Sequence, residues 1–162
     1  NGLAVGQHGL MGKQNVYEHS VGVPLMIKAA AQHTGKKTAD LCYLIDVFPT
    51  LCDMLQLPVP QSVDGISLLS SLDGKEPVRD YLYYSYMDNQ RGISDGTWKL
   101  IEYHVNGKRT TQLFNLKNDP WERNDLSGQK KYEKTIQRLR EKMAEEQKRT
   151  NDTSVFWNNF SY

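Results

Sequence analysis

The pattern of apolar and polar residues changes character near residue 75 of this 162-residue chain. Before that point, apolar residues form two short continuous runs, VPLMIK at 23–28 and LCYLI at 41–45. Such a run is typical of a strand that is buried on both faces, as in a parallel sheet. The residues between the runs, at 29–39, are small and polar and predict a loop. We therefore expect two buried strands in the first part of the chain.

A short helix is predicted directly after the second run. Asp46 can cap its N-terminus, and Pro49 then falls in the first turn, where a missing N–H costs no intrahelical hydrogen bond. The helix ends before the prolines of PVP at 58–60. Its buried stripe is expected to contain Val47, Leu51, Met54 and Leu55.

After residue 80 the apolar residues are aromatic and β-branched, in runs at 82–87, 91–94, 97–105 and 110–116. Asn106-Gly107 between two such runs is a strong hairpin signal, and Asp95-Gly96 marks a further turn. These runs predict an antiparallel meander of three or four strands over 80–117, followed by a turn-rich stretch at 118–126.

A long helix is predicted over 129–150, because Tyr132, Ile136, Leu139 and Met143 form one apolar stripe on a charged helix. The narrow stripe favours a helix that covers one face of the meander, and a partner-binding helix is the alternative. The aromatic tail at 154–162 is expected to dock onto the fold.

Composition excludes several classes of protein. Twenty basic and 19 acidic residues give a net charge of +1, which does not indicate a nucleic-acid partner. No run of 18 apolar residues exists, so no membrane span is predicted. Cys42 and Cys52 lack the spacing of a zinc site or a disulfide framework and are expected to be buried thiols.

The first thirteen residues, NGLAVGQHGLMGK, carry the candidate chemistry. The loop lacks both GxGxxG and the Ser or Thr of a nucleotide phosphate loop, which excludes those two sites. An oxyanion site remains, with Lys13 as a point charge and His8 as a hydrogen-bond donor or proton shuttle. Asn1 can offer an amide oxygen to a hard cation such as calcium. A solvated surface lysine is the alternative. Because a glycine-rich loop is an unusual place for a protein to begin, Asn1 is expected to be an internal residue of a longer chain.

Several segments in a fixed order point to one enzyme family. The chain reads NG, GQHG, GK, YE and VPLMI within 1–27, Asp46 before Pro-Thr-Leu, DGISL at 64–68, WKLI at 98–101 and QLFNLKNDPWERNDL at 112–126. In this order they resemble the C-terminal part of type I sulfatases, members of the alkaline phosphatase superfamily. The resemblance covers nearly the whole chain. It implies an α/β fold, in which residues 1–75 end an alkaline-phosphatase-like large domain and residues 76–162 form a small α+β domain.

The resemblance also implies roles for single residues. Asn1 matches a calcium ligand, Lys13 matches the lysine that contacts the sulfate, and His8 is expected to face the substrate or the leaving group. The family's nucleophile is a formylglycine made from the Cys or Ser of a C/S-x-P-x-R segment, which this chain lacks. The nucleophile is therefore expected upstream of Asn1, together with the further calcium ligands. Asp46 is expected to be a helix cap and Asp53 a surface residue, and neither is expected to replace an upstream ligand. Gly22 departs from the family, which commonly has Arg there.

The resemblance implies a parent enzyme that hydrolyses sulfate esters, with carbohydrates as the expected substrates. The expected partners are a sulfated carbohydrate and the N-terminal remainder of the same protein, in a periplasmic, secreted or lysosomal location. A phosphodiesterase or phosphonate monoester hydrolase of the same superfamily is one alternative. A non-catalytic interaction module is the other.

Overall fold

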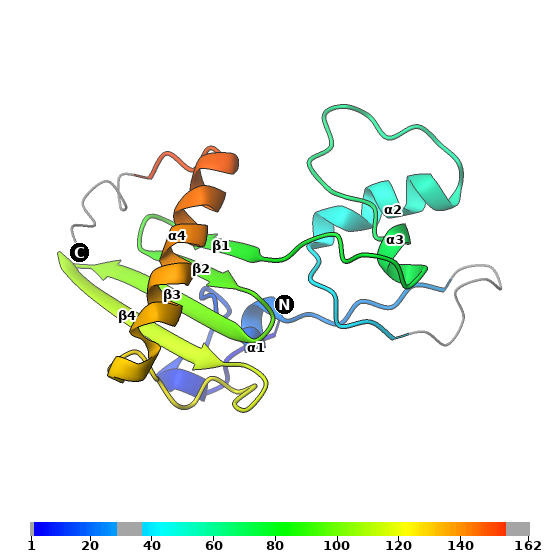
Figure 1. The fold of residues 1–162 in the computed structure, drawn as a ribbon. Coiled ribbons are helices and arrows are strands. Elements are labelled where there is room, and N and C mark those ends of the chain that lie inside the picture. Colours follow the sequence, from blue (N-terminus) through cyan, green and yellow to red (C-terminus); the bar gives the residue numbers. More distant parts are fainter. Residues whose placement is uncertain (1, 29–36, 155–162) are drawn as a thin grey trace. The chain divides into compact units, whose positions relative to one another are not determined.

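The computed structural model describes residues 2–28 and 37–154 (Figure 1). They form two units: the sheet unit, residues 2–24 with 83–154, and the helical unit, residues 25–28 with 37–82. The sheet unit contains two separate stretches of the sequence, because residues near the N-terminus pack on a sheet made by residues 82–115. The predicted domains, 1–75 and 76–162, concern a larger parent fold and remain a prediction.

Four strands form the sheet in the order β1 (Leu82–Tyr86), β2 (Gln90–Ser94), β3 (Trp98–Val105) and β4 (Lys108–Asn115). The order confirms the predicted meander. Asn106 and Gly107 form the two-residue turn between β3 and β4, with φ angles of 51° and 75°. A turn of this kind requires positive φ at both positions, which Asn and Gly adopt most readily.

One face of the sheet is covered by α4 (Glu133–Arg149), which follows a 3₁₀ turn at Lys130–Tyr132 (Figure 1). The helix contacts β2 and β3, and Ile136, Leu139 and Met143 are buried there. The Tyr132 ring packs 5.1 Å from the Trp98 ring. The predicted helix, its stripe and its place on the meander are confirmed.

The opposite face is covered by the N-terminal segment, which contains a 3₁₀ turn at Gln7–Gly9 and the short helix α1 (Glu18–Val21). Val16 and Tyr17 pack there against Ile101 and Phe114. Because side chains alternate along a strand, Lys99, Ile101 and Tyr103 of β3 all point to this face. The sheet is thus buried on both sides.

The helical unit contains α2 (Val47–Met54) and α3 (Leu69–Leu72), with a 3₁₀ turn at Leu44–Asp46. Asp46 lies at the N-cap of α2, as predicted, but its carboxylate makes no capping hydrogen bond to α2. It accepts hydrogen bonds from the backbone N–H groups of Tyr43 and Ile66 and forms a two-pronged ion pair with Arg79. Asp53 is exposed on α2.

The predicted strands at 23–28 and 41–45 are wrong for the described residues, which form neither. A parallel strand needs a neighbouring strand to satisfy its backbone groups, and the described part of the chain offers none beside these segments. Met26, Leu44 and Ile45 instead expose 92%, 61% and 54% of their surface.

The predicted stripe of α2 is also wrong in part, because Leu51 and Leu55 are exposed while Thr50 and Cys52 are buried. The Thr50 hydroxyl donates to the Asp46 carbonyl (2.5 Å) and accepts from the Leu68 N–H (2.9 Å), and this pair of bonds turns the Thr50 side inward.

Both cysteines are free. Cys52 is buried and Cys42 is half-buried, and this partial burial raises the pKa of the Cys42 thiol. Among the helices that the structure describes, none has both the length and the apolar character of a bilayer span. Most of the aromatic tail, 155–162, lies outside the described residues.

Candidate functional site

The glycine-rich loop folds back on itself in a short backbone ladder. The Ala4 N–H donates to the Gly12 carbonyl (3.1 Å), and the Gly6 N–H donates to the Leu10 carbonyl (2.8 Å). Residues at the tip have φ angles in the left-handed region, which side chains disfavour: Val5, Gly6, His8 and Gly9. The loop therefore needs its glycines for its shape, and His8 is held in an uncommon conformation.

An aromatic stack fixes His8 on the sheet. Its ring lies parallel to the Tyr17 ring, with centroids 3.9 Å apart and an interplanar angle of 7°. The Tyr17 hydroxyl donates to Gln112 Oε1 on β4 (2.6 Å). The His19 ring lies 5.8 Å from both partners. The tip of the loop is thereby tied to β4 through Tyr17.

The two imidazoles of this stack are poised to be neutral. Burial lowers the pKa of His8 below its ordinary value. Burial, and secondarily the nearness of His8, lowers the pKa of His19. Both ring nitrogens of His19 are buried and accept or donate no hydrogen bond within the described residues. His8 Nε2 already lies 3.4 Å from Gln7 Nε2, so a bound molecule that uses this nitrogen would share or replace that contact.

A buried ion cluster supports the segment behind the stack. Lys99 Nζ lies 2.8 Å from Glu18 Oε1 and 3.0 Å from Glu122 Oε1, and the side chains of Lys99 and Glu122 are fully buried. Glu122 Oε2 also accepts the Glu18 N–H (2.6 Å). Burial raises the pKa of Glu122, an effect that the Lys99 charge opposes. The cluster joins the start of α1, β3 and the turn after β4.

Sequence reasoning missed this cluster because its three members are far apart in the chain and share no spacing. One signal was available: Lys99 alternates with Ile101 and Tyr103 along a strand, so it occupies an inward position.

Two clefts open beside His8. The first, of about 520 Å³, is lined by Gln7, His8, Trp121 and Arg123, and we call it the tryptophan cleft. Trp121 is 62% exposed, and its carbonyl accepts a hydrogen bond from Gln7 Nε2 (2.9 Å). An exposed indole beside a guanidinium is a pairing that can hold a ring carrying an anionic group.

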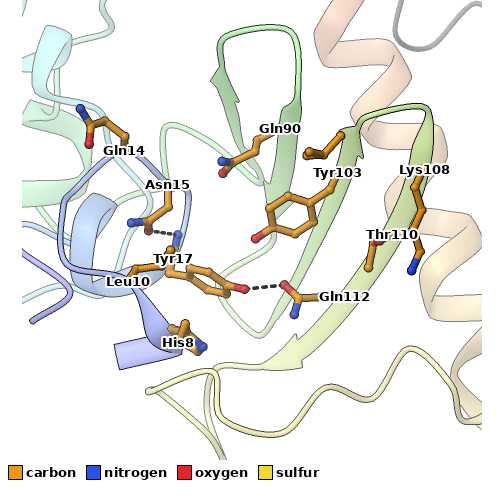
Figure 2. Close-up of a pocket in the computed structure, with 11 residues that line it drawn as sticks. His8, Leu10, Gln14, Asn15, Tyr17, Gln90, Tyr103, Lys108, Thr110 and Gln112 are labelled. Carbon is orange, nitrogen blue, oxygen red and sulfur yellow. Dashed lines mark hydrogen bonds between the residues drawn. The ribbon is translucent and has the colours of Figure 1, made fainter. Parts of the chain in front are cut away.

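The second cleft, of about 450 Å³, lies between the loop and the sheet, and we call it the sheet cleft. Figure 2 shows His8, Asn15 and Tyr17 on the loop side, facing Gln90, Tyr103 and Gln112 on the sheet side. Its lining consists of aromatic rings, amides, a hydroxyl, two aliphatic side chains and one cation, Lys108.

The predicted site residues are distributed unequally. His8 is half-buried and lines both clefts. Lys13 is exposed and lines neither cleft, so the structure does not gather the two residues around one cavity. Asn1 lies outside the described residues.

The described residues alone do not fit the calcium ion that the resemblance implies. Over 2–28 and 37–154, no group of three or more His, Cys, Asp or Glu side chains is placed to hold a metal ion. The calcium prediction therefore depends on Asn1 and on ligands from elsewhere. Gly2, the residue after Asn1, is packed tightly: a Cβ there would lie 2.0 Å from the His19 carbonyl oxygen, so only glycine fits at this position.

Gly22 has a local explanation. A Cβ at this position would lie 2.8 Å from Glu18 Oε2. An arginine there would therefore start beside the Glu18 carboxylate, which in this chain is already paired with Lys99.

Comparison with known proteins gives a consistent picture. The family profile described as N-sulphoglucosamine sulphohydrolase, C-terminal, matches residues 6–149. An N-acetylglucosamine-6-O-sulfatase of Bacteroides thetaiotaomicron is 29% identical over 164 residues, covering 93% of this chain and 29% of that protein. The chain thus spans less than a third of the length of that curated relative.

Solved structures show the same likeness. A protein in complex with its substrate, D-glucosamine-2-N,6-O-disulfate, matches with a TM-score of 0.57 and 27% identity over 69% of this chain and 25% of that chain. A phosphonate monoester hydrolase from Silicibacter pomeroyi matches with a TM-score of 0.70 and 21% identity over 90% of this chain and 33% of that chain. At that identity the second likeness concerns the fold alone, and it agrees with the α/β class that the sequence predicts.

Proposed function

The chain belongs to the sulfatase family, and on that premise we propose that the protein containing it hydrolyses sulfate esters of carbohydrates. The observation that carries the proposal is the family profile, whose match begins in the glycine-rich loop and ends with α4. The names of the relatives support a sugar substrate, since one acts on N-acetylglucosamine and another binds a glucosamine disulfate.

Within this proposal, Lys13 neutralises charge on the sulfate. The residue is exposed, and among the described residues it has no ion-pair partner. A compact, mobile point charge of this kind suits an oxyanion whose negative charge grows as the ester bond breaks.

His8 binds the sugar in this proposal. Its lowered pKa keeps the imidazole neutral at pH 7, so one ring N–H can donate to an ester or hydroxyl oxygen. Stacking on Tyr17 covers one face of the ring, so the substrate would meet the ring edge or the other face.

Calcium and formylglycine belong to the part of the protein beyond the described residues. When bound, the cation would polarise the sulfate oxygens and the formylglycine would supply the nucleophile. Asn1 is the residue of this chain proposed to contact the cation.

The test is the full-length protein with Lys13→Ala, compared with Lys117→Ala as a matched change at another exposed lysine. Sulfate release from N-acetylglucosamine 6-sulfate is followed by ion chromatography. We expect kcat/KM to fall by roughly 10²- to 10³-fold for Lys13→Ala, as for loss of a charge-stabilising group, and to stay unchanged for the control. Unaltered turnover by a folded Lys13→Ala protein would instead support a non-catalytic interaction module.

A phosphodiesterase or phosphonate monoester hydrolase of the same superfamily is the second candidate, which the resemblance leaves open. The same protein assayed on a phosphonate monoester, such as phenyl phenylphosphonate, and on a sugar sulfate separates the two. A higher kcat/KM on the phosphonate would replace the sulfatase proposal.

A further inference from the structure

The sheet cleft has the chemistry of a sugar-binding site rather than of an anion site. Of its lining side chains only Lys108 carries a full charge at neutral pH, and none is a carboxylate. The others are aromatic, amide, hydroxyl and aliphatic groups. A volume of about 450 Å³ lies within the range of clefts that hold small ligands.

Amide groups in the cleft have unused hydrogen-bonding capacity. Asn15 Oδ1 accepts the Tyr17 N–H (3.0 Å) and Gln112 Oε1 accepts the Tyr17 hydroxyl (2.6 Å). Both side-chain amides therefore keep their NH₂ groups without a partner among the described residues. Gln90 Oε1 is buried and receives no hydrogen bond from the described residues. An unsatisfied buried acceptor costs free energy that a hydroxyl donor would recover.

Aromatic rings complete the cleft on both sides. Tyr103 stands on β3, and the stacked rings of Tyr17 and His8 stand on the loop side (Figure 2). A pyranose has C–H faces that pack on aromatic rings and a rim of hydroxyls that exchange hydrogen bonds with amides. The aromatic rings of the cleft match the C–H faces of a pyranose, and its amides, which have unused donors and acceptors, match the hydroxyls.

We propose that the sheet cleft binds an unsulfated sugar residue of a glycan chain, a neighbour of the sulfated residue. The proposal rests on the proposed function for its choice of a glycan ligand. Asn15, Gln90 and Gln112 bind its hydroxyls, and Tyr103 packs on the ring. Lys108, exposed at the start of β4, binds an acidic group when the sugar carries one.

Two variants of the full-length protein test the cleft. Thr110→Trp places a large ring in it from an exposed position of β4, where strands accept Trp. Lys108→Ala removes its cation, and Lys134→Ala is the matched control on the helix-covered side, outside the cleft. Circular dichroism verifies that each variant is folded.

Binding is measured by calorimetry with two unsulfated tetrasaccharides, N-acetylglucosamine alternating with glucuronate and N-acetylglucosamine alone. We expect both to bind the wild type. Thr110→Trp should weaken both by more than about tenfold, and Lys108→Ala should weaken the glucuronate-containing one more than the other. Lys134→Ala should change neither.

Two results would overturn the proposal: no binding of either tetrasaccharide by the wild type up to about 10 mM, or equal affinities in a folded Thr110→Trp protein and the wild type. Because neither ligand carries sulfate, the outcome is separate from that of the Lys13→Ala assay. Binding without sulfate release would remove the proposed function and leave the sugar site.

Discussion

Replacing Lys99 by methionine removes the centre of the buried cluster while nearly conserving its volume. The change leaves Glu122, whose side chain is fully buried, without the cation 3.0 Å away. Removing one partner of a buried pair costs about 3–5 kcal/mol, because the other charge stays buried and uncompensated. Glu18 is 31% exposed, so solvent screens its share, and we assign it little of the cost.

The loss of folding stability in Lys99→Met should depend on pH. Burial raises the pKa of Glu122 above the ordinary value of 4.5, and without Lys99 the pKa rises further. Between the unfolded and the folded pKa, the folded state binds more protons, so stability falls as pH rises through that window. Lys99→Met should therefore destabilise the protein more at pH 7.5 than at pH 5, where Glu122 can take up a proton.

The measurement is urea denaturation of the 162-residue chain, followed by tryptophan fluorescence; two of its three tryptophans, Trp98 and Trp121, lie in the sheet unit. Glu122→Gln added to Lys99→Met removes the buried charge and keeps an acceptor for the Glu18 N–H. We expect the double variant to recover at least about half of the lost free energy of unfolding. A loss below about 1 kcal/mol at pH 7.5, or an equal loss at both pH values, would refute the reasoning.

Three further predictions concern other parts of the chain. In the full-length protein, the rate at which diethyl pyrocarbonate modifies His8 should reach half its maximum at a pH below 6.5, because burial lowers the pKa of His8. Peptide mass spectrometry measures the rate of modification at each pH. A midpoint above pH 6.5 would contradict the prediction. Gly107→Ala should cost about 1 kcal/mol in denaturation, since φ is 75° there and no atom crowds a Cβ, whereas Gly128→Ala, equally uncrowded, should cost almost nothing. The 162-residue chain should bind 8-anilinonaphthalene-1-sulfonate at the helical unit, and Leu51→Lys with Leu55→Lys, at positions 45% and 67% exposed, should lower the signal; no dye binding by the unaltered chain would disprove this.

The sheet unit was predictable because its signals are local. Asn106-Gly107 determines its own turn, and the stripe through Leu139 and Met143 needs only helical geometry. The helical unit was less so, because an apolar run such as 41–45 predicts a strand only when other strands lie beside it. The chain contains this apolar run, but its described residues include no strand that pairs with it.

The candidate site was half predictable for the same reason. His8 stood out by its place in a glycine-rich loop, but its stack on Tyr17 and its two clefts come from contacts across roughly a hundred residues, which leave no periodic trace in the sequence. Both clefts also require β4 or the turn after it, for example Gln112 and Trp121.

The N-terminal loop rests on a sheet that the ribosome makes much later. Glu18 bonds to Glu122, 104 positions further along the chain, and synthesis at 5–20 residues per second separates the two by about 5–20 s. Until β4 has been made, Val16 and Tyr17 cannot pack against Phe114, and Tyr17, on which His8 stacks, lacks its hydrogen bond to Gln112. The glycine-rich segment is thus translated before the strands it packs on, and it can reach its folded conformation only after they have been made.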